Sequence, residues 1–233
     1  MSHGFQFLAA YTFFKSIDDA RDSLGATIGG IDRTHRLVIS GTWSVPGPGH
    51  ATSAVVRKLG NGWSISGIVT LQSGLPFSIL DSGAGTLFGP ATLFTTGSLA
   101  PGATLGNAAR SGSVSSRVNE FFNPKAFAPA PFVPDGGLID GKYPVSGGGT
   151  IFGILGRNIL RGPDQRVGDI AVIKATPLTE RVNLIFRWEI FNVLNRPNFA
   201  NPSNDVSTTS TFGVISALTV NPRIMQYALK LEF

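Results

Sequence analysis

Few residues in this sequence have the type and spacing that catalysis or metal binding requires. The chain has three histidines and no cysteine, so disulfides, thiolate catalysis and cysteine-bound metals are excluded together. His3, His35 and His50 are far apart, and no carboxylate stands near them at metal-site spacing. For His35, at a strand entry, a structural or interfacial role is favoured. Since no nucleophile and base or paired carboxylates can be identified, we expect a protein that is not an enzyme and holds no metal or cofactor.

Two further motifs make weak cases for ligand binding. Asp18, Asp19 and Asp22 suggest calcium, but they lack the alternating ligands and the bidentate glutamate of a calcium loop. We therefore expect a solvated loop there. Gly147–Gly149 is not followed by the Lys-Ser/Thr pair of a phosphate-binding loop, so that function is excluded as well.

The strongest pattern in the chain is an alternation of apolar and polar residues with the period of a β-strand. Within 62–74, for example, Trp63, Ile65 and Val69 fall on one parity, while the other parity is mostly serine and threonine. Six ranges alternate in this way: 4–14, 34–45, 62–74, 166–176, 181–192 and 222–233. The last range ends on Phe233, an aromatic carboxyl terminus on the apolar parity, which is typical of an outer-membrane barrel strand.

Composition favours a membrane barrel over a soluble domain. Charged residues make up only 14% of the chain, whereas about 25% is usual in soluble proteins. No run approaches the 18 or so consecutive apolar residues of a membrane-spanning helix. The net charge of +5 is scattered, without the basic stripe of a nucleic-acid surface, so we expect no nucleic-acid partner. We predict an all-β fold, an antiparallel transmembrane β-barrel segment in contact with outer-membrane lipid.

The connections between the predicted strands alternate in length, as barrel loops do. Residues 81–165 are rich in small and polar residues with little periodicity, and are predicted to be a long, structureless extracellular loop. Residues 15–32 and 195–221 are predicted to be further outer loops. All three fall on the same side of the sheet. Residues 46–61 are the misfit, because they are long for a periplasmic turn.

One predicted strand carries candidates for a lumen-facing surface. If Phe186 and Trp188 meet lipid, the opposite parity of 181–192 faces the lumen. The candidates on that parity are Arg181, Asn183, Arg187 and Glu189. They could contact a plug or a passing substrate, but a polar wall that pairs with neighbouring strands is the favoured interpretation. Asn192 and Asn195, which follow, are expected to shape the strand exit rather than to bind a ligand.

Four segments and the carboxyl-terminal strand together resemble a known family over nearly the full chain. They are DRTHRLVISG (32–41, continuing to Trp43 and Pro46), GWSISGIVTLQSGLPF (62–77), GRNILRGP (156–163, followed by Asp169 and Lys174), a fourth from Glu180 through FRWEIFNVLNRPNF (186–199), and the end at 223–233. Their order and spacing are similar to the carboxyl-terminal barrel portion of Oar-like TonB-dependent receptors, which are outer-membrane transporters of acidobacterial type.

The resemblance implies parts that this sequence does not contain. Such receptors have a signal peptide, a carboxypeptidase-regulatory-like domain, a plug and a barrel of roughly 22 strands. We therefore expect residues 1–233 to be a fragment, about six carboxyl-terminal strands, that works only with the missing plug and amino-terminal barrel strands. The TonB system would act through the missing part. By the same resemblance, the barrel-assembly machinery would recognise a carboxyl-terminal signal made of Tyr227, Leu229, Leu231 and Phe233.

Three functions remain open at the level of sequence. The first is uptake of a large or scarce substrate by a TonB-dependent transporter in the cell outer membrane. The second is an outer-membrane adhesion or structural barrel whose long 81–165 loop is the binding part. The third is a soluble secreted β-sandwich that binds carbohydrate. A plug and TonB box encoded upstream would favour the first, and solubility without detergent would favour the third.

Overall fold

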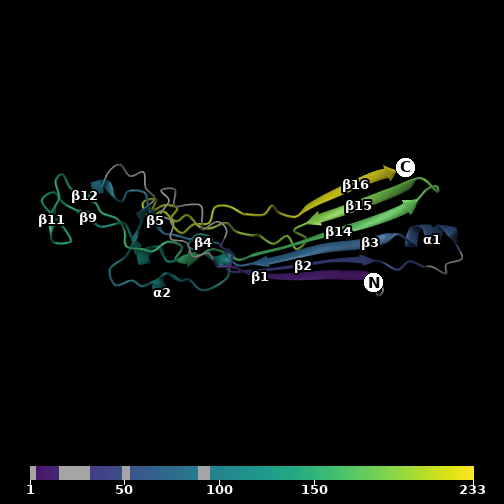
Figure 1. The fold of residues 1–233 in the computed structure, drawn as a ribbon, viewed down its shortest axis with the longest axis horizontal. Helices are drawn as coiled ribbons and strands as arrows, with labels where there is room; N and C mark the ends of the chain where they lie inside the picture. The colour runs from purple at the N-terminus through teal and green to yellow at the C-terminus, as the bar shows by residue number, and fades with distance from the viewer. Residues whose placement is uncertain (1–3, 16–31, 49–52, 89–94) are drawn as a thin grey trace.

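One antiparallel sheet of six long strands is the main element of the computed structural model, which describes residues 4–15, 32–48, 53–88 and 95–233. The strands are β1 (Phe5–Phe13), β2 (His35–Ser44), β3 (Trp63–Gln72), β14 (Gln165–Pro177), β15 (Asn183–Phe191) and β16 (Ile224–Glu232). They lie side by side in the order β1-β2-β3-β14-β15-β16 (Figure 1). The all-β, antiparallel prediction is confirmed, and each predicted range overlaps one of these strands with small differences at its ends. His3 and His50, and the expected solvated loop at Asp18, Asp19 and Asp22, lie outside the described residues.

The strand register gathers the apolar stripes of all six strands on one face. Residues directly opposite each other in neighbouring antiparallel strands share a face of the sheet. One row of such partners crosses the whole sheet through Phe5, Trp43, Ile65, Val172, Trp188 and Tyr227. The adjacent row lies on the other face and consists of Gln6, Thr42, Ser66, Ala171, Glu189 and Gln226. The sheet therefore has one apolar face and one largely polar face.

The two ends of the sheet differ in what connects the strands. The short β14–β15 turn, the carboxyl terminus and helix α1 (Ala54–Gly60) lie at one end, and the long connections lie at the other (Figure 1). Helix α1 explains why residues 46–61 are long for a turn. None of the helices in the described ranges is long and apolar enough to cross a membrane.

The described residues of 73–164 and 192–223 form what we call the loop body. It contains paired two-residue strands and short helices. The strand pairs are β4 (Pro76–Phe77) with β13 (Leu160–Arg161), β5 (Leu80–Asp81) with β6 (Thr95–Thr96), β7 (Ser98–Leu99) with β8 (Phe127–Ala128), β9 (Phe132–Val133) with β12 (Gly149–Thr150), and β10 (Leu138–Ile139) with β11 (Tyr143–Pro144). The helices are α2 (Leu105–Ala108) and the 3₁₀ turns η1 (Thr86–Phe88), η2 (Val114–Arg117) and η3 (Pro124–Ala126).

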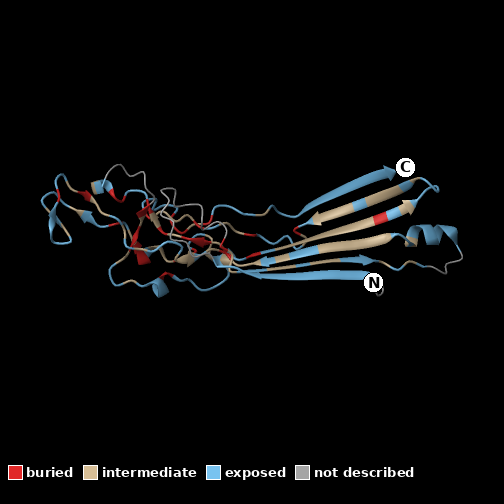
Figure 2. Cartoon of the chain, in the orientation of Figure 1, coloured by how far each residue is buried: buried red, intermediate tan, exposed pale blue. Residues whose placement is uncertain are grey.

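The loop body has its own apolar core, so the prediction that 81–165 is structureless is wrong. Phe122 lies at its centre, with ring centroids 5.5 Å from Phe127 and 5.0 Å from Phe212. Phe212 belongs to the second long connection, so the two connections pack as one body. Hydrogen bonds such as Ile215 N to Val118 O, at 2.7 Å, join them as well. Buried residues are concentrated in this body rather than in the sheet (Figure 2).

Candidate functional site

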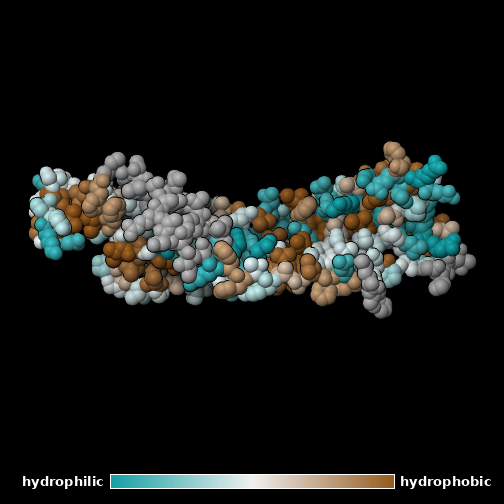
Figure 3. Space-filling view, viewed as in Figure 1, coloured by the Kyte–Doolittle hydropathy of each residue, from teal (hydrophilic) through white to brown (hydrophobic). Residues whose placement is uncertain are grey.

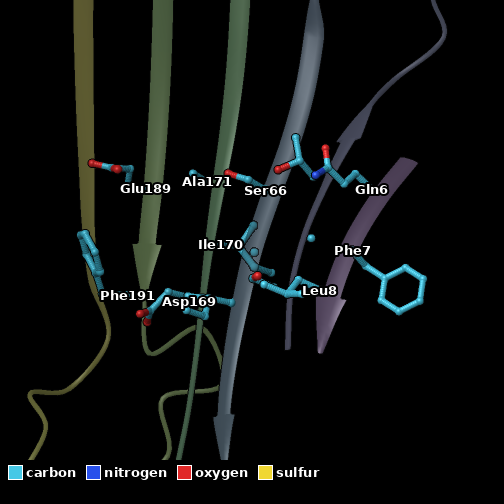
Figure 4. A pocket seen from close by; sticks show the side chains of 14 residues that line it. Gln6, Phe7, Leu8, Ser66, Asp169, Ile170, Ala171, Glu189 and Phe191 are labelled. Carbon is cyan, nitrogen blue, oxygen red and sulfur yellow. The ribbon is translucent and has the colours of Figure 1, made fainter. Parts of the chain in front are cut away.

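The polar face of the sheet carries a cavity of about 490 Å³, which is the candidate site. The cavity is lined by residues of β1, β2, β3, β14 and β15, which include the polar row described above and neighbouring residues on each strand (Figure 4). The lining residues whose side chains lie on the polar face are Gln6, Leu8, Ser40, Thr42, Ser66, Ile68, Asp169, Ala171, Glu189 and Phe191. Hydroxyls, two carboxylates and a few apolar groups form a mixed wall that can hydrogen-bond to a polar solute.

Asp169 and Glu189 give this wall its negative charge. The Asp169 side chain is held in place, because its Oδ1 accepts a hydrogen bond of 2.8 Å from the backbone N–H of Asn192. Glu189 Oε1 lies 2.8 Å from a guanidinium nitrogen of Arg187 two residues earlier on the same face. Because the Arg187 side chain is half exposed, this ion pair adds little stability. Asp169 is not among the predicted lumen-facing residues, although its parity, opposite to that of Ile170 and Val172, indicates this face.

The four predicted lumen-facing residues do not all lie together. Asn183, Arg187 and Glu189 share the polar face of β15. Of these, Glu189 lines the cavity, and Asn183 stands at the strand end opposite Glu232. Arg181 lies before the strand, in the turn after β14, where its backbone N–H donates to Thr179 Oγ1. Arg187 and Glu189 form an ion pair with each other along β15.

The end of β15 is shaped by asparagine side chains, as expected from the sequence. Asn192 and Asn195 both have φ of 49°, a left-handed conformation that asparagine tolerates better than most residues. The Asn192 amide is buried and donates to the carbonyls of Arg196 and Asn221 at 3.0 and 3.1 Å. Asn195 Oδ1 accepts from the N–H of Arg223, at the entry to β16. These bonds turn the chain out of the sheet and set the position of the last strand.

The buried side chain of Gln165 connects several segments at the end of the sheet that adjoins the loop body. Gln165 Oε1 accepts from Arg33 at 3.0 Å and from Gln72 at 2.8 Å, and its Nε2 donates to Thr219. Burial, and then the positive charge of Arg36, lower the pKa of Arg33. The guanidinium remains charged, because the ordinary pKa of arginine is far above neutrality. We call this set of contacts the rim network.

A close backbone approach next to the rim network explains the glycine at position 74. A Cβ on Gly74 would lie 1.9 Å from the carbonyl oxygen of Gly162, and Gly162 N donates to Leu75 O at 2.9 Å. Arg161, beside this contact, lies 3.4 Å from Asp32 Oδ2. The segments 32–41, 62–77 and 156–163 therefore meet here. All three segments thus contribute residues to the junction between the sheet and the loop body.

The predicted carboxyl-terminal signal lies on β16, at one edge of the sheet. Tyr227, Leu229 and Leu231 all occupy its apolar face, opposite Trp188, Phe186 and Leu184 on β15. The Tyr227 ring stacks on Trp188 with centroids 5.9 Å apart and an interplanar angle of 6°. Phe233 follows the strand and is 99% exposed.

The remaining chemical candidates have structural surroundings. Within the ranges that the structure describes, no group of three or more His, Asp or Glu side chains could hold a metal ion. His35 Nδ1 lies 2.8 Å from the hydroxyl of Tyr11, and its ring lies 5.5 Å from that of Phe13. Gly147 N donates to Asp135 Oδ1 at 2.7 Å, within the loop body.

Comparison with known proteins gave one family. The family model described as "Outer membrane beta barrel domain" matches residues 1–226. Searches of curated proteins and of solved structures gave no match.

Proposed function

Because this chain belongs to the outer membrane beta barrel domain family, we propose that it forms part of the wall of a TonB-dependent transporter of the Oar-like type. Its location is the outer membrane, and its apolar face meets lipid. The transporter would take up a substrate that is too large or too scarce for simple pores. We further propose that the chain is not an enzyme and that its polar face guides a solute.

The observation that carries this proposal is the largely polar row that crosses all six strands, with Ala171 as its one apolar member, and the cavity on the same face. A sheet face of hydroxyls, amides and carboxylates is what the wall of a water-filled passage requires. Trp43 and Trp63 lie near one end of the apolar face, and Tyr11 and Phe13 lie near the other. Such aromatic residues are typical of the two membrane–water boundaries of a barrel.

The proposal requires partners for the two sheet edges. Among the described residues, β1 and β16 each pair with one neighbour only, and the sheet does not close on itself. In hydrocarbon, each unsatisfied backbone group costs on the order of several kcal/mol. We propose that further barrel strands pair with both edges, that a plug lies against the polar face and connects to the TonB system, and that Tyr227, Leu229, Leu231 and Phe233 act as the signal for the barrel-assembly machinery.

Site-specific photo-crosslinking in native outer membranes would test the proposal. A photo-reactive residue at Ser66, on the polar face, should capture peptides of a plug domain that carries a TonB box. The same residue at Val69, on the apolar face, should capture none of these peptides. If the crosslinks from Ser66 contain only the loop body of this chain, transport with a plug is wrong. The reading frame upstream of Met1 supplies an independent check, since a TonB-dependent receptor encodes its plug before its barrel.

The compact loop body favours adhesion as a second candidate. A packed core such as that around Phe122 can present a fixed surface to a neighbouring cell or matrix. Deletion of residues 98–150 should then abolish surface attachment while the polar face remains accessible to thiol reagents at Ser66→Cys. The third function considered, a soluble β-sandwich, is inconsistent with the family and with the single amphipathic sheet.

A further inference from the structure

Helix α1 is held against the apolar face of the sheet by two side chains of that face. Trp63 Nε1 donates to the carbonyl of Leu59 at 2.8 Å. Lys174 Nζ donates to the carbonyls of Lys58 and Asn61 at 3.0 and 2.5 Å. Trp63 and Lys174 are directly opposed on β3 and β14, and the ammonium lies 5.2 Å from the centroid of the Trp63 ring. The carboxyl-terminal turn of α1 is therefore fixed on the lipid side of the sheet end.

The lysine on the apolar face is explained by this contact. Lys174 is only 8% exposed, and its carbon chain lies along the face while its charge reaches the end of the helix. Two carbonyls and the face of an indole stabilise that charge. An arrangement of this kind requires the helix, because without it the ammonium would be left on an apolar surface.

The segment before the helix also packs closely on it, so its position is well defined. A Cβ on Gly60 would lie 2.4 Å from Pro48 Cδ, and a Cβ on Gly47 would lie 1.8 Å from Asn61 Oδ1. Both glycines permit contacts that any side chain would block. The helix is thus docked at its carboxyl-terminal end from two sides.

The free surface of α1 is amphipathic. Val55, Val56 and Leu59 are 64%, 49% and 66% exposed, and at about 100° per residue they cover an arc of about 100°. Arg57 and Lys58 are exposed on the opposite side, and the helix contains no acidic residue. Hydrophilic residues gather at this end of the sheet, beyond the hydrophobic ones over its middle (Figure 3). No part of the chain that the structure describes buries the three aliphatic side chains.

We propose that α1 lies in the membrane interface and binds anionic phospholipid in the leaflet at this end of the barrel. Its aliphatic side enters the acyl boundary, continuous with the lipid-facing surface of the sheet, and Arg57 and Lys58 bind headgroup phosphates. The occupant is lipid because the exposed aliphatic arc adjoins the face that already meets lipid. The opposite, basic side matches anionic headgroups in charge. This inference rests on the family and on the apolar face, and it does not require transport.

Fluorescent labelling tests the depth of the helix directly. The chain has no cysteine, so Val56→Cys carries a single environment-sensitive label in the full chain inserted into phosphatidylcholine vesicles with or without phosphatidylglycerol. A lipid-borne quencher should quench the label at Val56→Cys and spare the one at Lys58→Cys. A label at Val69→Cys, on the apolar face of β3, reports insertion of the same preparation. A label at Glu180→Cys, in the short turn at the same end, provides the water-exposed reference.

The charged side is tested with the double variant Arg57→Gln, Lys58→Gln. Phosphatidylglycerol should strengthen lipid contact of the Val56→Cys label on the order of tenfold in the parent, and this gain should be lost in the double variant. If the label at Val56→Cys is as accessible to aqueous iodide as the one at Glu180→Cys while Val69→Cys is quenched by lipid, the interfacial position is wrong. If Val56→Cys is quenched equally with and without phosphatidylglycerol, the anionic-lipid part is wrong.

Discussion

The six-stranded sheet and the loop body bury opposite kinds of side chain. The buried hydrophobic residues of the described chain all lie between Phe77 and Ile215, and none belongs to one of the six long strands. The buried residues of those strands are Gln165 and Lys174, one polar and one charged. In Figure 2 the sheet is correspondingly exposed or half-buried, and the buried colour is concentrated in the loop body.

This difference in buried side chains indicates that the two regions are stabilised in different environments. The loop body excludes water from a core of phenylalanines, which is how a domain in water is stabilised. The sheet leaves Phe7, Tyr11 and Leu229 more than 60% exposed, at 67%, 62% and 69%, without a second layer. Backbone pairing stabilises the sheet, and we propose that lipid covers its exposed apolar face, since in water such a surface would aggregate. One chain thus combines two regions with separate sources of stability, and substitutions should affect them separately.

The largest expected effect is in the loop body. Phe122→Ala removes the ring that contacts Phe127 and Phe212, and should destabilise this body by about 3–5 kcal/mol. Hydrogen exchange at the Ile215 amide, which bonds to Val118 O, should become faster, while amides of the sheet stay protected. Phe88→Ala is the matched control, because that ring is 55% exposed. Equal loss of protection in the sheet would contradict the separation of the two regions.

The next effect concerns the apolar face of the sheet. Val172→Arg places a charge in the middle of this face, between Ile65 and Trp188, and should cost about 2–4 kcal/mol in a membrane. Its neighbour Ala171 lines the polar cavity, so Ala171→Arg should have a much smaller effect. The amount of protease-resistant protein in outer membranes measures both. Similar yields of the two variants would show that the assigned faces are incorrect.

The same contrast explains what the sequence could predict. Strands such as β3 and β15 obey a period of two, because one face must suit lipid and the other must suit water, so their ranges and faces follow from parity. The antiparallel register pairs apolar parity with apolar parity, as for Trp43 opposite Ile65, but parity alone leaves shifts of two residues open. The role of Asn192 and Asn195 in shaping the exit from β15 could also be predicted, since asparagine tolerates a left-handed backbone conformation.

The loop body and the helix could not be predicted, for a physical reason. Core residues such as Ile79, Phe122 and Val206 lie on irregular backbone without a regular spacing, and some of their partners, such as Phe212 for Phe122, come from a different connection. Helix α1 has seven residues, which is too short for a periodic signal. The contact of Lys174 with carbonyls of α1 depends on folding that the strand pattern does not specify.

A smaller effect is expected where the two regions join. Gly74→Ala would place a Cβ against the carbonyl of Gly162, and relief of this overlap should cost about 1–3 kcal/mol. The nearest atom to a Cβ on Gly156 is a side-chain carbon at an ordinary 3.4 Å, so Gly156→Ala is the matched control. Proteolysis should become faster in 73–80 and 160–164 in the first variant alone. If both variants resist proteolysis equally, the close approach does not constrain the junction.

The smallest expected effect is a pH dependence confined to the loop body. Burial alone would raise the pKa of Asp205, but hydrogen bonds from Ser207 and Ser82 outweigh it and hold that pKa below its usual value. A carboxyl whose pKa is lower in the folded state adds stability above its unfolded pKa, and this stability is lost as the pH falls through the folded pKa. The protection of the Ser207 amide, which bonds to Asp205 Oδ1 at 2.9 Å, should therefore decrease under acid conditions. In Asp205→Asn this extra decrease should disappear, because the amide has no charge to lose.

The rim network around Gln165 contains no carboxyl, so amides there should show the same pH profile in both proteins. A profile that shifts equally at Ser207 and at the rim would mean that the acid effect is global, and that the loop body does not unfold independently of the sheet.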